Sequence, residues 1–241
     1  MNNDQQHIDN DHLNIGVLVF EGMTSLDALG PFEVLARTPN STCHLVGKDR
    51  KPLRGDTGLI VTPTTSFEDA PQFDVLVVPG GPGQNDLMGD QELLAFLRHQ
   101  AKEARWITSV CTGSLLLAAA GLLTGYKATC HWLSLEFLRM FPVEVAPDRV
   151  VVDRNRVTGG GVTSGLDFAF VLLGLLRGEA AARKIQLLME YDPAPPFLSG
   201  HPRVADESTV EAVKALAQPM LARRGAVSLE AARRLSEKPR K

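Results

Sequence analysis

The sequence has few cysteines, no long apolar run and no excess of basic residues, and each shortage excludes a class of protein. Lys and Arg number 25 against 28 Asp and Glu, so the formal net charge is −3. A chain with this balance lacks the basic surface by which proteins bind nucleic acids or anionic membranes. The longest strongly apolar run, Phe168 to Leu176, is far shorter than the ~20 residues that cross a bilayer. We therefore expect neither a nucleic-acid nor a membrane partner.

The three cysteines, Cys43, Cys111 and Cys130, are irregularly spaced. An odd number does not form a complete disulfide framework, and the sequence has no CxxC or HxxxH pair for zinc. We predict no metal, no cofactor and reduced thiols, which are typical of the cytoplasm. The polar N-terminus has neither the basic start nor the apolar segment of a secretory signal, which also favours a cytoplasmic location.

Apolar runs that suit buried strands alternate with helical patterns along the chain. Strands are predicted at 13–20, 41–46, 59–62, 74–79 and 106–110, with a hairpin at 150–153 and 156–158. Helices are predicted from Gly30-Pro31 to Arg37 and over 90–104, 112–121, 132–140, 164–176 and 179–191. This alternation predicts an α/β fold of the flavodoxin-like class, in which helices sandwich a mainly parallel sheet.

We divide the chain into a disordered tail (1–12), one catalytic domain (13–203) and a C-terminal helical extension (204–241). The proline-rich stretch 192–202 is expected to be extended. Ser208 to Glu211 has the pattern of a capping box for a helix in the extension, and Pro219 is expected to bend or end that helix. The arginine pairs at 223–224 and 233–234 are interpreted as a solvated helix face.

Cys111 lies where a predicted strand meets a predicted helix. Ser109 and Gly113, two residues before and after it, are small, as a tight nucleophile elbow requires. A thiol at a helix N-terminus is close to unpaired N–H groups and the positive end of the helix dipole, which lower the thiol pKa. A buried, inert cysteine is the alternative, but the strand-turn-helix context favours a nucleophile.

The sequence resembles the DJ-1/PfpI superfamily in DVLVVPGG (74–81), in SVCTGSLLLAAAGLL (109–123) and in the HW pair that follows. Within the superfamily, it most resembles the isonitrile hydratase branch. The elbow and the glycine-rich turn are shared with the sensor domains of AraC-type regulators, whereas EYDPAPPF is more discriminating for the hydratases. The stretches that carry this narrower resemblance are 26–34, 110–114, 157–163 and 188–197.

The resemblance implies three catalytic residues. Cys111 would be the nucleophile, Asp27 the carboxylate beside its sulfur, and Thr112 a group that holds the substrate or a water. Asp27 could instead cap a helix, and Thr112 could serve only the geometry of the first helical turn. Proteolytic relatives often carry a histidine directly after the cysteine, so Thr112 disfavours protease chemistry.

Further residues are predicted around the substrate. Gly80-Gly81 would present free backbone N–H groups to the sulfur and stabilise developing negative charge, with Gly160 and the amide of Val162 on the other side. Such glycines also serve turns that need positive φ. His131 could lie near the nucleophile or be a buried histidine with its hydrogen bonds satisfied, and Trp132 is either a pocket wall or part of the core.

The implied activity is hydration of a small isonitrile to an N-substituted formamide through a thioimidate on Cys111, in a homodimer. One alternative is a non-catalytic ligand- or redox-sensing domain, and another is a glyoxalase-like stress enzyme. AraC-type regulators carry a C-terminal DNA-binding module with helix-turn-helix elements. The stretch after Pro202 is too short and the chain too acidic for that module.

Overall fold

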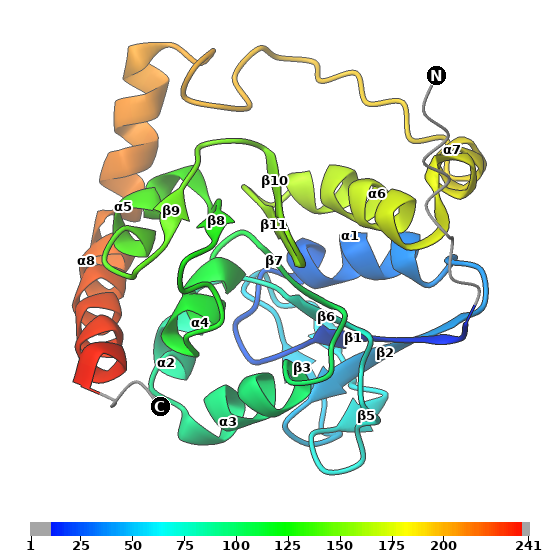
Figure 1. Ribbon diagram of the computed structural model, residues 1–241. Coiled ribbons are helices and arrows are strands. Elements are labelled where there is room, and N and C mark those ends of the chain that lie inside the picture. The colour runs from blue at the N-terminus through cyan, green and yellow to red at the C-terminus, as the bar shows by residue number, and fades with distance from the viewer. Residues whose placement is uncertain (1–10, 238–241) are drawn as a thin grey trace.

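The apolar runs of the sequence join into one seven-stranded sheet at the centre of the computed structural model (Figure 1). Its strand order is β10-β11-β7-β6-β1-β2-β5, and every neighbouring pair is parallel except β10 with β11. The structure describes residues 11–237, so residues 1–10 of the predicted tail and 238–241 of the predicted extension lie outside it. The strands of the sheet are β1 (Leu13–Leu18), β2 (Ser41–Gly47), β5 (Thr65–Ser66), β6 (Val75–Val78), β7 (Trp106–Val110), β10 (Val150–Asp153) and β11 (Arg156–Gly159).

Two short strand pairs stand apart from this sheet. β3 (Leu53–Arg54) pairs with β4 (Ile60–Val61), and β8 (Lys127–Ala128) pairs with β9 (Glu144–Val145). The short strand predicted at 59–62 is confirmed as β4. Strands of two residues leave no periodic pattern in a sequence, so β3, β5, β8 and β9 were not predictable.

Helices cover both faces of the sheet (Figure 1). One layer contains α1 (Ser25–Leu35), α6 (Ser164–Arg177) and α7 (Glu179–Leu188). The predicted flavodoxin-like α/β fold is therefore confirmed. Within residues 11–237, no helix combines the length and the apolar character that a membrane crossing requires. The other layer contains α2 (Gln84–Leu87), α3 (Gln91–Gln100), α4 (Gly113–Ala119), the 3₁₀ helix η1 (Trp132–Ser134), α5 (Leu135–Leu138) and α8 (Glu207–Glu237).

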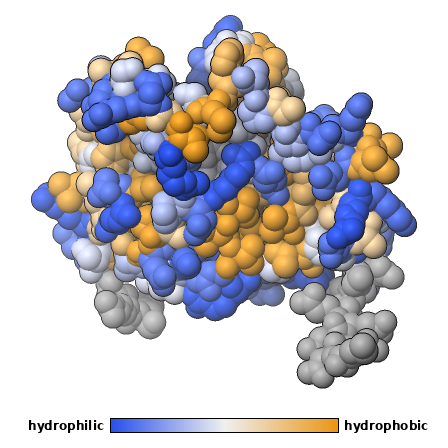
Figure 2. All heavy atoms as spheres, turned by 90° about the horizontal axis from the view of Figure 1, so that it is seen from above, coloured by the Kyte–Doolittle hydropathy of each residue, from blue (hydrophilic) through white to orange (hydrophobic). Residues whose placement is uncertain are grey.

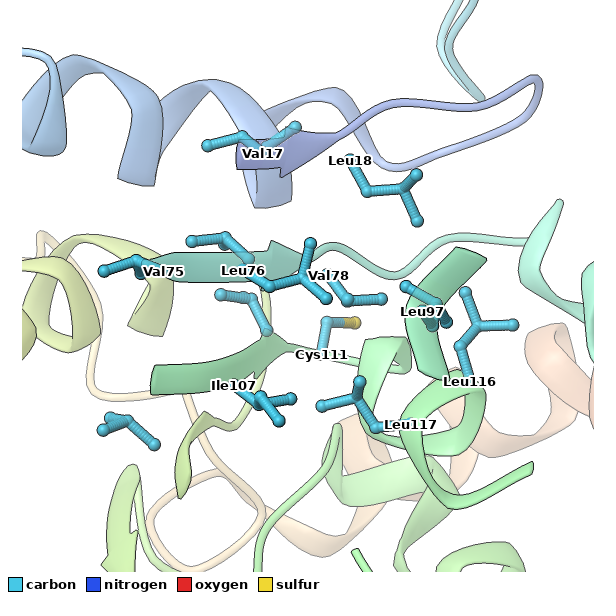
Figure 3. Packing of buried hydrophobic residues seen from close by; sticks show 14 of the residues in the cluster. Val17, Leu18, Val75, Leu76, Val78, Leu97, Ile107, Cys111, Leu116 and Leu117 are labelled. Carbon is cyan, nitrogen blue, oxygen red and sulfur yellow. The ribbon is translucent and has the colours of Figure 1, made fainter. Parts of the chain in front are cut away.

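The central strands are buried on both faces, which explains their continuous apolar runs. All four residues of β6 are inaccessible to solvent, and the side chains of β1 and β6 pack together above the elbow (Figure 3). Burial of each such side chain contributes roughly 1.5–3 kcal/mol to stability. The carboxyl ends of β1, β6 and β7 are thereby fixed side by side, and the site lies there.

The first helix begins earlier than the sequence suggests. The pattern predicts a start at Gly30-Pro31, but α1 begins at Ser25 and Pro31 lies inside it. Proline fits best in a first turn, because it lacks the N–H that an interior residue donates. Packing of α1 against α6 outweighs that loss. As a result, Asp27 lies in the first turn of a helix and not in the loop before it.

The C-terminal extension also differs in detail from its prediction. The N–H of Thr209 donates to Asp206 Oδ1 at 2.9 Å, so the cap is Asp206 and not Ser208. α8 continues through Pro219 to Glu237. It packs against α2, α4, η1 and α5, and Arg224 is only 3% exposed. The prediction that Arg224 belongs to a solvated face is wrong, because tertiary packing covers it.

Candidate active site

Cys111 lies at the junction of β7 and α4 in a left-handed backbone conformation, with φ of +57°. This conformation costs a non-glycine residue about 1–2 kcal/mol, so the surrounding fold must impose it. Its N–H donates to the carbonyl of Gly159 at 3.0 Å. A Cβ at Gly113 would lie 2.0 Å from the carbonyl oxygen of Val78, so this position admits only glycine. The predicted elbow geometry is therefore present.

Asp27 reaches the elbow from α1 and is completely buried. Its Oδ2 accepts the N–H of Gly80 at 3.0 Å, and its Oδ1 has no hydrogen-bond partner in the described part of the chain. Because the side chain binds a different loop and not the N–H groups of its own helix, a simple capping role does not account for it. Asp27 is instead held against the end of β6, beside Cys111.

Thr112 completes this group of side chains. Its Oγ1 accepts the N–H of Gly81 at 3.0 Å, so its hydroxyl proton remains available for another acceptor. A Cβ at Gly80 would lie 2.4 Å from the Thr112 nitrogen and 3.0 Å from Asp27 Oδ2. The backbone of Gly80 is therefore the point on which Asp27 and Thr112 converge.

The predicted role of the two glycines needs correction. The sequence suggests free N–H groups at Gly80 and Gly81 that face the sulfur, but both groups are already engaged by side chains. The glycines are required because they allow close approach, and their amides fix Asp27 and Thr112. Of the backbone N–H groups near the sulfur, that of Thr112 interacts with it and lowers the pKa of Cys111.

The electrostatics of Cys111 also differ from the sequence-based expectation. Burial raises the pKa of Cys111 well above its usual range, and the neighbouring charge of Asp27 raises it further. Burial likewise raises the pKa of Asp27 to about 7, although interactions with the Cys111 thiol and the Gly80 amide oppose the rise. The prediction of a thiolate stabilised by the helix terminus is wrong for this resting state, because burial outweighs the helix dipole. Cys111 and Asp27 instead form a coupled pair that holds a proton at neutral pH.

A pocket of about 300 Å³ brings together four residues predicted around the substrate, but Cys111, Asp27 and Thr112 do not line it. Gly160, in its wall, directly follows the residue whose carbonyl binds the Cys111 amide. Pocket and elbow are thus joined through 159–160 and through Cys130, whose charge would act on Cys111. The predicted residues in the wall are His131, Trp132, Gly160 and Val162.

His131 is neutral in this environment. Burial lowers its pKa to about 4, and the positive charge of Arg224 adds to the effect. Its Nδ1 accepts the N–H of Leu133 at 3.3 Å, so the ring proton is on Nε2. His131 can therefore donate a hydrogen bond from Nε2, but it is not a cation at neutral pH.

Sequence reasoning missed some residues of this region. Gly200, His201 and Arg203 line the same pocket, although they lie in or beside a proline-rich stretch with no catalytic pattern. Arg224 on α8 affects both His131 and Cys130 electrostatically. No local signal marks these residues, because only folding returns the end of the chain to the elbow. Among residues 11–237, no cluster of three or more His, Cys, Asp or Glu is arranged to hold a metal ion.

Comparison with known proteins places this architecture in a family. The DJ-1/PfpI family model matches residues 14–175. Isonitrile hydratase of Pseudomonas putida is 47% identical over 224 residues, which are 93% of this chain and 98% of that protein. The HTH-type transcriptional regulator GbdR of Pseudomonas aeruginosa is 31% identical over 188 residues, which are 74% of this chain but 51% of the regulator.

A solved structure supports the same assignment over nearly the full chain. A ThiJ/PfpI family protein from Pseudomonas syringae matches with a TM-score of 0.88 and 38% identity. The match covers 95% of this chain and 96% of that one, so it extends beyond the segment matched by the family model. The chain therefore belongs to the DJ-1/PfpI family, as its sequence motifs predict.

Proposed function

We propose that this protein is an isonitrile hydratase, a lyase that adds water to an isonitrile and releases an N-substituted formamide. Similarity to the Pseudomonas putida isonitrile hydratase over nearly the full length of both chains supports the activity. The observation that carries the mechanism is the buried pair of Cys111 and Asp27 at the end of β7, because it combines a nucleophile with a proton carrier.

The first step joins the substrate to the enzyme. The terminal carbon of R–N≡C accepts both a nucleophile and a proton. Asp27 takes the Cys111 thiol proton as the sulfur bonds to that carbon, and then delivers the proton to the same carbon. The product is a neutral thioimidate, R–N=CH–S–Cys111. A carboxyl pKa of about 7 suits this role, because such a group gives and takes a proton with similar ease at neutral pH.

The second step releases the product. Asp27 and the Thr112 hydroxyl orient a water that adds to the thioimidate carbon, while the substrate nitrogen gains a proton. Collapse of the adduct breaks the carbon–sulfur bond, releases R–NH–CHO and returns the proton to the thiol. Proton transfer through Asp27 balances each step, so the scheme needs no oxidant or reductant.

The pocket combines apolar surface with charged groups, since Asp148, Arg149 and Arg203 also line it. Trp132, Leu135 and Val162 supply apolar surface for the hydrocarbon group R. His131 is neutral and adds no charge there. We propose that the Val162 amide and Gly160 border the reacting carbon on the side opposite Gly80-Gly81.

Incubation of the full-length protein with cyclohexyl isocyanide tests the proposal, with N-cyclohexylformamide followed by NMR. We expect turnover by the wild type and by a Cys43→Ala control, whose half-buried thiol lies on β2, away from the site. Cys111→Ala should show none above the uncatalysed rate. Turnover by Cys111→Ala, or an inactive wild type, would contradict the proposal, and lactate formation from methylglyoxal would favour the glyoxalase alternative.

The burial of Cys111 bears on the redox-sensing alternative. Sensor cysteines are usually exposed and have low pKa values. Cys111 is 5% exposed and its pKa is raised by burial. These properties favour a catalytic thiol that becomes reactive when its proton moves to Asp27.

We also propose that the protein is a homodimer. Leu187, Leu188, Phe197 and Leu198 are 71–83% exposed, and they lie in α7 and the segment after it, near the top of Figure 1. Figure 2 looks onto the molecule from that side and shows apolar surface gathered between polar groups. Exposed apolar clusters of this kind usually mark interfaces. Light scattering should give the dimer mass for the wild type and a monomer for Leu187→Glu with Phe197→Glu; a monomeric wild type would contradict the proposal.

A cytoplasmic location is the third part of the proposal. The three cysteines are free in the structure, and they lie on β2, at the elbow and at the pocket. Free thiols are typical of the cytosol, where glutathione and thioredoxin keep them reduced. Cell fractionation of a host that expresses the protein fused to a fluorescent reporter tests this. Fluorescence in the cytosolic fraction would agree with the proposal, whereas export of the fusion would contradict it.

A further inference from the structure

Arg224 is a buried cation without a carboxylate partner in the described part of the chain. It is 3% exposed, and its guanidinium binds neutral groups only. Nε donates to Asn85 Oδ1 at 3.2 Å, one Nη donates to Ser134 Oγ at 2.9 Å, and the other contacts the sulfur of Met220 at 3.4 Å. Arginine keeps its proton in proteins, so this positive charge is permanent. Burying it is unfavourable unless a negative charge nearby compensates.

The two side chains that hold Arg224 come from segments that border the site. Asn85 is on α2, directly after the loop whose amides fix Asp27 and Thr112. Ser134 ends η1, and its N–H donates to the carbonyl of His131 at 2.7 Å. α8 therefore inserts a positive charge between the two loops that flank Cys111.

The titratable groups around Arg224 indicate which of them can supply a compensating negative charge. Cys130 is protonated because burial raises its pKa to about 12, even though Arg224 lowers it. His131 is neutral. Asp86 on α2 pairs with Arg223 at the surface. Besides Cys130, the group whose negative charge interacts favourably with Arg224 is Cys111, which lies beside Asp27.

We propose that Arg224 is a positioning residue of the active site, whose buried charge stabilises the negative charge that develops on Cys111 when its proton moves to Asp27. It touches neither the sulfur nor the substrate pocket directly. Its charge favours the ionised forms of Cys130 and Cys111, against the effect of burial, so that α8 forms part of the site. The effect of Arg224 on isonitrile turnover rests on the proposed function, but its effect on the pKa of Cys111 does not.

Two variants of the full-length protein separate charge from packing. Arg224→Gln keeps a hydrogen-bonding group but removes the charge, whereas Arg224→Lys keeps the charge. Arg223→Met is the matched control, because Arg223 is adjacent on the same helix and exposed to solvent. The readout is the pH midpoint at which the Cys111 thiolate forms, followed by ultraviolet absorbance and by alkylation with iodoacetamide. Peptide mass spectrometry distinguishes Cys111 from Cys130.

We expect Arg224→Gln to raise this midpoint by about one pH unit and to lower isonitrile turnover at pH 7 about tenfold. Arg224→Lys should keep both the midpoint and the turnover near their wild-type values, and Arg223→Met should change neither.

Should Arg224→Gln fail to fold, Asn85→Asp provides the second test, because a carboxylate there neutralises the guanidinium in place and should raise the midpoint similarly. An unchanged midpoint in a folded Arg224→Gln or Asn85→Asp protein, or an equal shift in Arg223→Met, would overturn the proposal. A shifted midpoint in a protein that hydrates no isonitrile would support Arg224 and refute the proposed function.

Discussion

Asp27 and Arg224 are both buried ionisable side chains near Cys111, and the fold accommodates them in opposite ways. Asp27 is on the first helix, in contact with the sulfur and fixed by a backbone amide. Arg224 is on the last helix and is held by the side chains of neutral residues. A carboxyl group reduces the cost of burial by keeping a proton, whereas a guanidinium does not lose one. The comparison teaches that the group that can gain or lose a proton, Asp27, lies beside the reacting sulfur. The group with a permanent charge, Arg224, lies farther from it, on α8.

Of the changes that test this comparison, removal of the Asp27 carboxylate should have the largest effect on turnover. Asp27→Asn is expected to reduce isonitrile turnover by about 10²- to 10⁴-fold, the range typical of lost general acid–base catalysis. It should also lower the pKa of Cys111, because the charge of Asp27 raises that pKa. Steady-state kinetics and thiolate absorbance measure the two effects. Turnover equal to that of the wild type would remove Asp27 from the mechanism, and a raised thiol pKa would contradict the assigned electrostatics.

The pH dependence of stability should distinguish the two buried groups next. The folded pKa of Asp27, about 7, is above its unfolded value of about 3.9. The stability associated with the protonated carboxyl is therefore complete below about pH 4 and is lost as the pH rises through 7. The free energy of unfolding of Asp27→Asn relative to the wild type should increase by about 2–4 kcal/mol between pH 4 and pH 8.

Urea denaturation at several pH values measures that difference. Arg224→Gln provides the contrast, because a guanidinium keeps its proton throughout this range and so contributes no titration of its own. A difference between Asp27→Asn and the wild type that stays flat from pH 4 to pH 8 would show that Asp27 is not a buried, protonated group.

The smallest expected effect comes from filling the space at Gly80, where Asp27 and Thr112 meet. Gly80→Ala places a Cβ 2.4 Å from the Thr112 nitrogen, a backbone atom that cannot move freely. We expect a loss of about 2 kcal/mol in stability, together with reduced turnover, because Asp27 and Thr112 both shift. Thermal unfolding and kinetics check this.

Gly174→Ala is the matched control for that substitution, since a Cβ there makes an ordinary contact of 3.9 Å with the Cβ of Ala182, and Gly174 lies on α6, outside the pocket. It should leave both stability and turnover near wild-type values. A Gly80→Ala protein as stable and active as Gly174→Ala would mean that the site tolerates more movement than the contacts at Gly80 imply.

Much of the fold could be predicted from sequence, and the failures have physical causes. Strands such as β6 are recognisable because burial on both faces requires a continuous apolar run. The start of α1 was wrong because proline favours a first turn, yet tertiary packing against α6 retains it in the interior. The burial of Arg224 was not predictable, since an arginine pair on a helix is usually solvated.

The candidate site shows the same division. The elbow at Cys111 could be located, because its small neighbours are a local steric requirement. The protonation of the thiol was predicted incorrectly, because a helix terminus is visible in a sequence and desolvation is not. The convergence of Asp27, Thr112 and Gly80 depends on three strands that are distant in sequence.

The sequence by itself determined the α/β fold, the family and the position of the turn that carries Cys111. These depend on local patterns, namely apolar periodicity, small residues at a tight turn and short motifs. Only the tertiary structure decided that Cys111 and Asp27 hold a proton together, that the amides of Gly80-Gly81 are already occupied, and that Arg224 is buried behind the site. The reason is physical: pKa values and buried charges are set by desolvation and by neighbours across the chain, and both arise only when the chain has folded.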